Sequence, residues 1–338
     1  MIRDISLDIR EFFSQTKHLC KISSYVYKNK VSMRFCNKFT EDIAAEFFEY
    51  FKNYQKFTEN LKVLQEGFSE EQQSYIMFLI SRMLGSHHSR ILGTYNLTET
   101  EIQEYKKAIR VLYGAIKKEK EGYSYNGIVL PIHHFELSVF YYELGINYIK
   151  KPNKLINTDF IDAGAFIGDS PIILNKLNPQ NIYGFEPVKQ SFDLMLQTIK
   201  LNNINNIIPV KSGLGSEIGE MDIAIDGANG ISSSIGSNTC QKEKIFVDTI
   251  DNFAQNNNLN IGLIKIDTEG MEQDILKGAK NTIKKDKPVL IVSIYHSAKD
   301  FFEIKPLIES WNLGYKFRIV KLIPKSYIVD TMLICEVF

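Results

Sequence analysis

The sequence predicts an α/β fold in two parts, a mostly α-helical domain over residues 1–151 and a doubly wound, mainly parallel sheet domain over residues 152–338. Apolar residues recur at helical spacing through the first part. In the second part, short apolar runs alternate with helical stretches, which is typical of parallel strands joined by helices. Acidic residues also follow several of these runs, and this pattern favours a ligand site at one end of the sheet.

The composition is that of an ordinary globular protein, with 44% hydrophobic and 24% charged residues among 338. The formal net charge is zero, so no overall basic field favours nucleic acid or an anionic membrane as a partner. The start, MIRDISLDIREFF, is too charged for a signal peptide, and no apolar run approaches the ~18 residues of a membrane span. Without C-x-x-C spacing, the cysteines are predicted to be reduced thiols in a cytoplasmic protein: Cys20, Cys36, Cys240 and Cys335.

The first part is predicted to contain three amphipathic helices. Thr40 can cap the first, in which apolar residues from Ile43 to Phe57 fall at helical spacing. Capping-box patterns precede the other two, at Ser69 with Gln72 and at Thr98 with Glu101.

Gly127–Pro131 is predicted to be a short strand, His134–Leu144 a further helix, and Lys150–Lys154 a polar linker. We expect the domain over residues 1–151 to be a cap over the ligand cleft at the end of the sheet, a selector of substrate or a surface for pairing with a second copy.

In the second part, predicted strands alternate with predicted helices along the chain. Buried parallel strands are predicted at Phe160–Asp162, Ile182–Phe185, Ile207–Val210, Ile261–Ile266 and Val289–Tyr295. Two final strands, near Phe317–Lys321 and Thr331–Val337, are close enough in sequence to form a hairpin, which predicts an antiparallel edge.

The stretch DFIDAGAFIGDS contains a glycine turn with the spacing D-x-G-x-x-x-G, at Asp162, Gly164 and Gly168. This differs from the G-x-G-x-x-G of dinucleotide-binding proteins. Glycines at the end of a strand let the backbone approach a cofactor. The acid before the first glycine suits a cofactor with a cationic amino-acid end, and Asp169 with Ser170 can begin the next helix.

Five ionisable residues follow the predicted strands at or just beyond their carboxyl ends, namely Asp162, Glu186, Asp267, Glu269 and His296. In a doubly wound sheet these strand ends line one crevice. Glu186 lies 22 residues after Gly164, where an acid can accept hydrogen bonds from both hydroxyls of a ribose.

The second part resembles the FkbM family of S-adenosylmethionine (SAM)-dependent methyltransferases over residues 156–338. The segments that carry the resemblance are IDAGAFIGDS, IYGFEPVKQSFDLM, IPVKSGLG, VDTIDNF, LIKIDTEGMEQDILKGA and PVLIVSIYH. The resemblance implies a Rossmann-like class I methyltransferase sheet. It also implies transfer of a methyl group to a hydroxyl of a small molecule, often a saccharide.

By this resemblance, Asp162 and Gly164 would hold the methionine part of SAM, Glu186 the ribose, and Ser212 with Gly213 the adenine. Further cofactor-binding candidates lie beside these residues, at Ala163, Gly168, Asp169, Ser170 and Pro187. Asp267 and Glu269 occupy the D-x-E positions of the family beside the reacting centre, with Thr268 in place of the commoner aliphatic residue.

The catalytic candidates are Asp267, Glu269 and His296. A hydroxyl is a poor nucleophile, so a base or a metal ion is needed to remove its proton. Either His296 or Glu269 can be that base, with Asp267 orienting it or the amine of SAM. The alternative is that all three hold a divalent cation that activates the hydroxyl.

The sequence does not exclude two other functions. A nicotinamide-dependent oxidoreductase is disfavoured because G-x-G-x-x-G is missing from the turn. A SAM-binding module without catalysis, acting through its helical part, is the other alternative. Methylation of nucleic acid is disfavoured, because the sequence has neither a basic stripe nor an N/D-P-P-Y motif.

Overall fold

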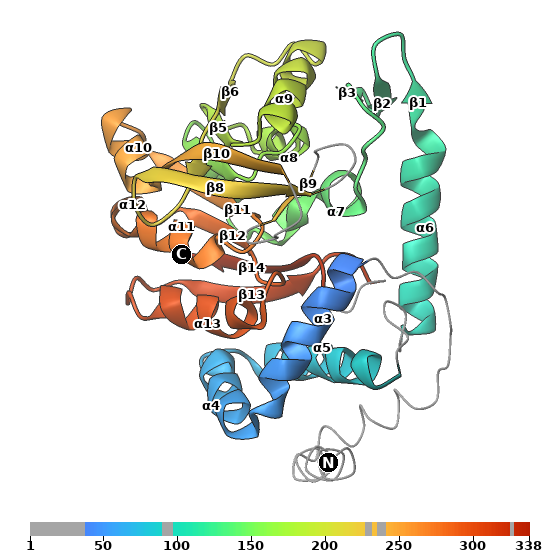
Figure 1. The fold of residues 1–338 in the computed structure, drawn as a ribbon, viewed down its shortest axis with the longest axis vertical. Helices are drawn as coiled ribbons and strands as arrows, with labels where there is room; N and C mark the ends of the chain where they lie inside the picture. Colours follow the sequence, from blue (N-terminus) through green and yellow to red (C-terminus); the bar gives the residue numbers. More distant parts are fainter. Residues whose placement is uncertain (1–37, 90–96, 227–231, 235–240, 325–327) are drawn as a thin grey trace.

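The computed structural model describes residues 38–89, 97–226, 232–234, 241–324 and 328–338 (Figure 1). Of the four cysteines, only Cys335 falls within these ranges, and it is a buried free thiol. None of the helices in the described part of the chain has the length and apolarity needed to cross a membrane.

A seven-stranded sheet forms the centre, in the order β13-β14-β12-β11-β4-β5-β6. The central strands are apolar and buried on both sides because helices cover both faces, as expected for parallel strands. The strands are β4 (Asp159–Ala163), β5 (Ile182–Phe185), β6 (Ile207–Val210), β11 (Ile261–Ile266), β12 (Val289–Ser293), β13 (Lys316–Lys321) and β14 (Thr331–Glu336). The predicted mainly parallel sheet, with a helical part before it, is confirmed.

The antiparallel strand is placed differently from the prediction. β14 pairs antiparallel with both β12 and β13, so it lies one position inside the sheet. The edge strand β13 consequently runs in the same direction as the parallel strands. Sequence proximity predicted the hairpin correctly, but it does not say which strand of a hairpin joins the sheet.

Helices cover the two faces of the sheet. Two buried clusters result, one on each face, and each includes residues from both halves of the chain. The helices of the second half are α8 (Asp169–Leu174), α9 (Lys189–Leu201), α10 (Ile250–Asn256), α11 (Glu272–Gly278), α12 (Lys280–Asp286) and α13 (Ala298–Glu309), with short 3-10 turns at Pro152–Leu155 and Asn175–Leu177.

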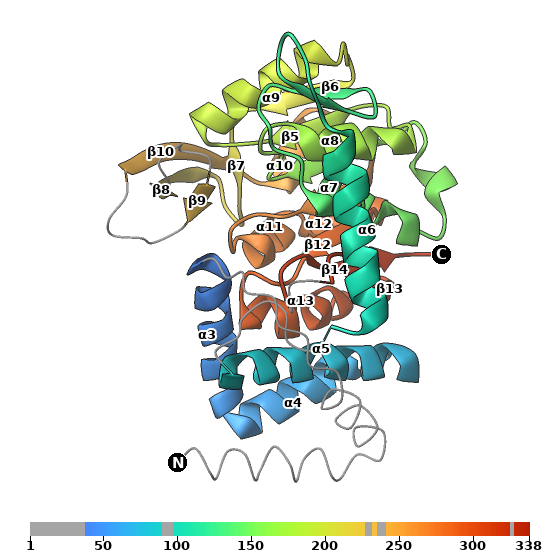
Figure 2. The ribbon, with the colours of Figure 1, turned by 90° about the vertical axis from the view of Figure 1, so that its right-hand side faces the viewer.

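Helices are present where they were predicted in the first half, and they divide between the two faces. The helix predicted from Ile43 to Phe57 is split at Asn53 into α3 and α4, and α3 begins at Lys38, ahead of the predicted cap Thr40. Figures 1 and 2 show α3, α4 and α5 beside α13, whereas α6 runs along the flank of the molecule. Phe302 of α13 stacks on Tyr50 at 4.9 Å between ring centroids and meets Phe57 edge-on at 5.8 Å. The bounds are α3 (Lys38–Lys52), α4 (Tyr54–Gln65), α5 (Glu70–Ser89) and α6 (Glu99–Ala115).

The chain between α6 and the sheet domain corrects one prediction. The expected helix His134–Leu144 is reduced to the single turn α7 (Leu137–Phe140), followed by a 3-10 segment at Glu143–Tyr148. Leu144 and Gly145 have φ of 55° and 75°, which an α-helix cannot accommodate. A three-stranded antiparallel sheet precedes α7, formed by β1 (Lys117–Lys118), β2 (Tyr123–Tyr125) and β3 (Ile128–Leu130).

A second, smaller sheet projects from the main one after β6. Its order is β7-β10-β8-β9, and its strands are β7 (Gly213–Leu214), β8 (Gly219–Asp226), β9 (Ser232–Ser234) and β10 (Gln241–Asp248).

Candidate active site

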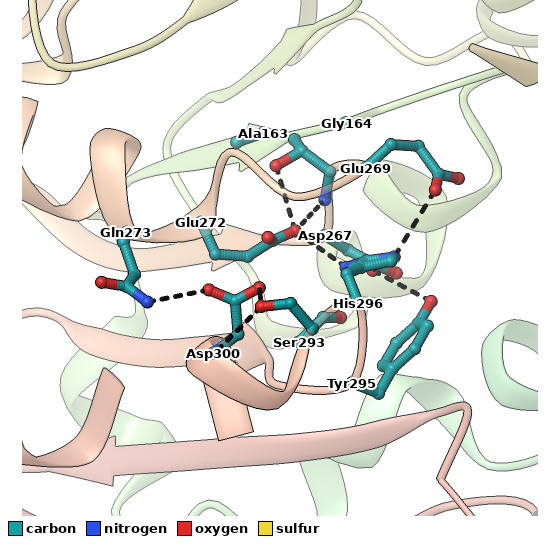
Figure 3. Close-up of polar contacts among 12 residues, drawn as sticks. Ala163, Gly164, Asp267, Glu269, Glu272, Gln273, Ser293, Tyr295, His296 and Asp300 are labelled. Carbon is teal, nitrogen blue, oxygen red and sulfur yellow. Dashed lines mark hydrogen bonds and ion pairs between the residues drawn. The ribbon is translucent and has the colours of Figure 1, made fainter. Parts of the chain in front are cut away.

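The carboxyl ends of β4, β5, β11 and β12 meet along one edge of the parallel sheet, and the predicted site residues follow them. Three of these residues lie close together after β11 and β12, namely Asp267, Glu269 and His296 (Figure 3). The glycine turn follows β4 in the next position of the sheet. The structure therefore brings the acidic cluster and the turn to neighbouring strand ends.

Gly164 gives the glycine turn its close fit against the end of β11. Its φ is +81°, and a Cβ atom added to it would lie 2.0 Å from the carbonyl oxygen of Asp267. Gly168 also has a left-handed φ, of +84°, at the position that begins α8. Glycine has no Cβ atom, so it can adopt the left-handed backbone angles at both positions, and at Gly164 it also allows the close approach to the carbonyl oxygen of Asp267.

Replacing Gly164 by alanine is expected to destabilise the protein by more than the ~1–2 kcal/mol that a left-handed alanine costs. The added methyl group would push the turn away from Asp267 and weaken binding of S-adenosylhomocysteine. Gly127→Ala is the matched control, since Gly127 has φ +82° and open space around the added Cβ. Urea unfolding of both variants separates the two effects, and equal losses of stability would contradict the role of the close contact.

Asp162 lies beneath the glycine turn in a fully internal ion pair. Its Oδ1 is 2.9 Å from Nζ of Lys265, and its Oδ2 accepts a hydrogen bond of 2.6 Å from the hydroxyl of Ser170. Lys265 also donates to the carbonyl of Gly164 at 2.8 Å. Burial alone would lower the pKa of Lys265, but Asp162 and Asp267 outweigh it and the pKa is raised. These contacts hold the turn in place from below.

Glu186 lies beside the turn, at the end of β5. Its two carboxylate oxygens accept the backbone N–H groups of Phe166 at 3.1 Å and Val188 at 2.8 Å. Burial raises the pKa of Glu186 to about 7, against the opposing effect of these hydrogen bonds. The carboxylate is thereby fixed in orientation and retains further lone pairs for a ligand.

The other cofactor-binding candidates are mostly engaged within the protein. Asp169 accepts the N–H of Ser170 at 3.0 Å, and burial with the charge of Glu136 raises the pKa of Asp169 to about 7. The hydroxyl of Ser212 donates to the carbonyls of Gly213 and Phe246. Ala163 is the buried last residue of β4, Pro187 is partly exposed, and Gly213 begins the smaller sheet.

His296 lies in the middle of the acidic cluster, with its side chain only 6% exposed. Its Nδ1 is 3.0 Å from the buried carboxylate of Glu272, and its Nε2 is 3.9 Å from both Asp267 and Glu269 (Figure 3). The hydroxyl of Tyr295 donates to Asp267 at 3.3 Å. The ring is thus held from one side and faces two carboxylates on the other.

The directions of the pKa shifts in this cluster distinguish the two candidate bases, His296 and Glu269. Burial alone would lower the pKa of His296, but Glu272, Asp267 and Glu269 together raise it to about 9. At neutral pH the imidazole therefore carries a proton and cannot accept another. Burial raises the pKa of Glu269, and His296 lowers it in part. A carboxylate with a raised pKa is a better proton acceptor than an ordinary one.

Among the described residues, no group of three or more His, Cys, Asp and Glu side chains has the arrangement needed to hold a metal ion. The geometry therefore gives the divalent-cation alternative at Asp267, Glu269 and His296 no support.

Two residues of this region were missed in the sequence. A lone lysine within the apolar run LIKI needs a buried partner, and Lys265 is in register with Asp162 on the adjacent strand. Glu272 follows Thr268 by four residues and accepts both its N–H, at 2.9 Å, and its hydroxyl, at 3.1 Å. The contact between Glu272 and Thr268 is local, whereas the contact between Glu272 and His296 depends on tertiary packing.

Residues 162–317 match the family model described as the methyltransferase FkbM domain, which confirms the resemblance predicted from the motifs. A curated protein, Methyltransferase 1 of Beauveria bassiana (strain ARSEF 2860), is 26% identical over 173 residues, covering 44% of this chain and 70% of that protein.

Two solved structures illustrate the structural likeness. The methyltransferase FkbM of Methylobacillus flagellatus KT is 18% identical, with a TM-score of 0.44, over 79% of this chain and 71% of that chain. TrmK of M. capricolum, solved with S-adenosyl-homocysteine, is 17% identical, with a TM-score of 0.33, over 55% and 65% of the two chains.

Proposed function

We propose that this chain, whose residues 162–317 form a methyltransferase domain of the FkbM family, uses SAM to methylate a hydroxyl of a small polyhydroxylated molecule. The observation that carries the proposal is the meeting of a glycine turn, a ribose-compatible glutamate and a carboxylate–histidine cluster at one edge of the sheet. Pairing with a second copy and a cytoplasmic location remain predictions.

The residues around the turn fit a cofactor that is cationic at its methionine end. SAM, when bound, supplies an electrophilic methyl group on a sulfonium. The partly exposed backbone at Gly164 and Phe166 can approach its methionine part, and Glu186 can accept the ribose hydroxyls. Asp162 and Ser170 would act indirectly, because their side chains pair with each other and with Lys265.

The mechanism assigns proton removal to Glu269. Its carboxylate, whose side chain is 43% exposed, can reach an acceptor in the crevice. The acceptor hydroxyl would give its proton to Glu269 while its oxygen takes the methyl group that the sulfonium of SAM would supply. Protonated His296, fixed by Glu272, would orient Glu269 and Asp267 on the same side of the crevice. Positioning in line supplies up to about 7–11 kcal/mol of the barrier reduction.

The experiment that tests this function is a methyl-transfer screen with labelled SAM over glycosides, nucleotide sugars and small alcohols, with and without EDTA. We expect transfer to a hydroxyl that survives chelation. Tight binding of NAD with none of S-adenosylhomocysteine would support the oxidoreductase instead. Binding of S-adenosylhomocysteine without transfer to any acceptor in the panel would favour the non-catalytic module.

Binding of S-adenosylhomocysteine is expected to weaken as the pH falls through about 7, the value to which burial raises the pKa of Glu186. The ionised carboxylate present above that pH accepts hydroxyl hydrogen bonds, and protonation below it removes acceptor capacity. Calorimetric titrations between pH 5.5 and 8.5 would measure the change. Glu186→Gln should bind more weakly above that pH and flatten the profile, and an unchanged profile in this variant would contradict the assignment.

A further inference from the structure

The segment before α7 reaches the proposed site from the first half of the chain. The ring of His134 meets the ring of Phe166 edge-on, with 5.2 Å between centroids. Phe166 lies within the glycine turn, and its N–H is the group that binds Glu186. His134 is therefore packed directly on the partly exposed side of the turn that the cofactor is proposed to approach.

Glu136 pairs with His134 in the segment that packs on the glycine turn. Its Oε1 is 3.2 Å from Nε2 of His134, and its side chain is 54% exposed. Although it occupies the N-cap position of α7, its carboxylate makes no capping hydrogen bond. The negative charge of Glu136 raises the pKa of Asp169 on one side of the crevice and of Glu269 on the other. The carboxylate thus lies within electrostatic reach of both the turn and the acidic cluster.

We propose that His134 and Glu136 form the acceptor-side wall of the methyl-transfer site, where Glu136 binds the hydroxyls that flank the methylated one. This inference rests on the proposed function and deepens it by naming the acceptor class. An ionised carboxylate has two oxygens that can each accept a hydroxyl hydrogen bond, which matches neighbouring hydroxyls on a sugar ring.

The same charges exclude anionic acceptors. The carboxylates of Glu136, Asp267 and Glu269 outnumber the one positive charge of protonated His296, so a phosphate group placed among them would be repelled. A neutral glycoside brings no such charge. The structure therefore points to neutral, polyhydroxylated acceptors in preference to sugar phosphates and nucleotide sugars.

This inference gives the helical first half of the chain a specific role in binding the acceptor. The segment of this half at residues 134–136 supplies part of the wall, so the helical half acts as a selector of the acceptor. His133 is a matched control, because its ring turns toward Tyr123 at 4.9 Å and Phe135 at 6.2 Å and so takes part in a different contact.

The test measures methyl transfer to a panel of neutral methyl glycosides (gluco, galacto, manno and rhamno) and the corresponding sugar 1-phosphates, in the full chain. We expect transfer to at least one glycoside and slower transfer to its 1-phosphate. Glu136→Gln should raise KM for that glycoside about tenfold, as expected for loss of a charge-assisted hydrogen bond, with kcat changed by less than about threefold. His134→Ala should raise KM in the same way, and His133→Ala should leave it unchanged.

Calorimetry with S-adenosylhomocysteine separates this inference from the function on which it rests. Glu136→Gln and His133→Ala should keep the cofactor affinity of the unaltered protein. If that protein binds S-adenosylhomocysteine but methylates no glycoside, or if Glu136→Gln leaves KM unchanged, the inference is overturned and the methyltransferase assignment stands. If it binds no S-adenosylhomocysteine, the proposed function itself fails.

Discussion

Glu269→Gln is expected to lower kcat for methyl transfer by about 10²–10⁴-fold, the usual contribution of a general base, with little change in the affinity for S-adenosylhomocysteine. Glutamine has nearly the same shape and can still accept a hydrogen bond, but it cannot take the proton of the acceptor hydroxyl. The measurement is single-turnover transfer from labelled SAM to the best acceptor from the screen, beside calorimetry of the cofactor product.

Glu220→Gln is the matched control, since Glu220 lies on the smaller sheet with its side chain 64% exposed and pairs with Lys244. This variant should have the activity of the unaltered protein. His296→Ala should also reduce kcat, because it removes the group that faces both Glu269 and Asp267 at 3.9 Å. If Glu269→Gln keeps full activity while His296→Ala loses it, the proton passes to His296 and the assignment of the base is wrong.

The strand ends were predictable because a parallel sheet imposes a simple rule. Buried parallel strands appear in the sequence as continuous apolar runs, and their carboxyl ends lie at one edge of the sheet. The motifs after β4 and β11 could therefore be assigned to one crevice from the sequence, whereas the rule does not say which strands are neighbours. The proximity of His296 to Asp267 and Glu269 followed from the same rule.

What was missed depends on contacts between segments that are distant in sequence. The apolar spacing around His134–Leu144 predicts a long helix, but left-handed backbone at Leu144 and Gly145 ends it, and no local pattern shows that. The packing of His134 on Phe166 joins residues from the two halves of the chain. The sequence pattern changes near residue 151, and this change is the basis of the predicted domain boundary. In the structure, both halves of the chain contribute residues to each buried cluster.

Lys265→Met should reduce the free energy of unfolding by about 3–5 kcal/mol, which is the usual cost of removing one partner of a buried ion pair. Asp162, which is fully buried, would keep only the hydroxyl of Ser170 as a partner. The loss of the Lys265 contact to the Gly164 carbonyl should also loosen the turn and weaken binding of S-adenosylhomocysteine. Urea unfolding at pH 8 measures the first effect and calorimetry the second. Lys277→Met is the control, because this half-exposed lysine pairs with Asp274 at the surface and should cost at most about 1 kcal/mol.

The pH dependence of the Lys265→Met variant distinguishes a buried charge from a simple packing defect. Burial raises the pKa of Asp162, and Lys265 is the main group that opposes this. Without the lysine the pKa rises further, so the folded variant binds a proton at a pH where the unfolded chain does not. Stability linked to that proton is gained as the pH falls. The deficit relative to the unaltered protein should therefore be smaller at pH 5 than at pH 8, and Asp162→Asn in the same chain should remove most of this difference. A deficit that is constant with pH would mean that Lys265 acts through packing alone.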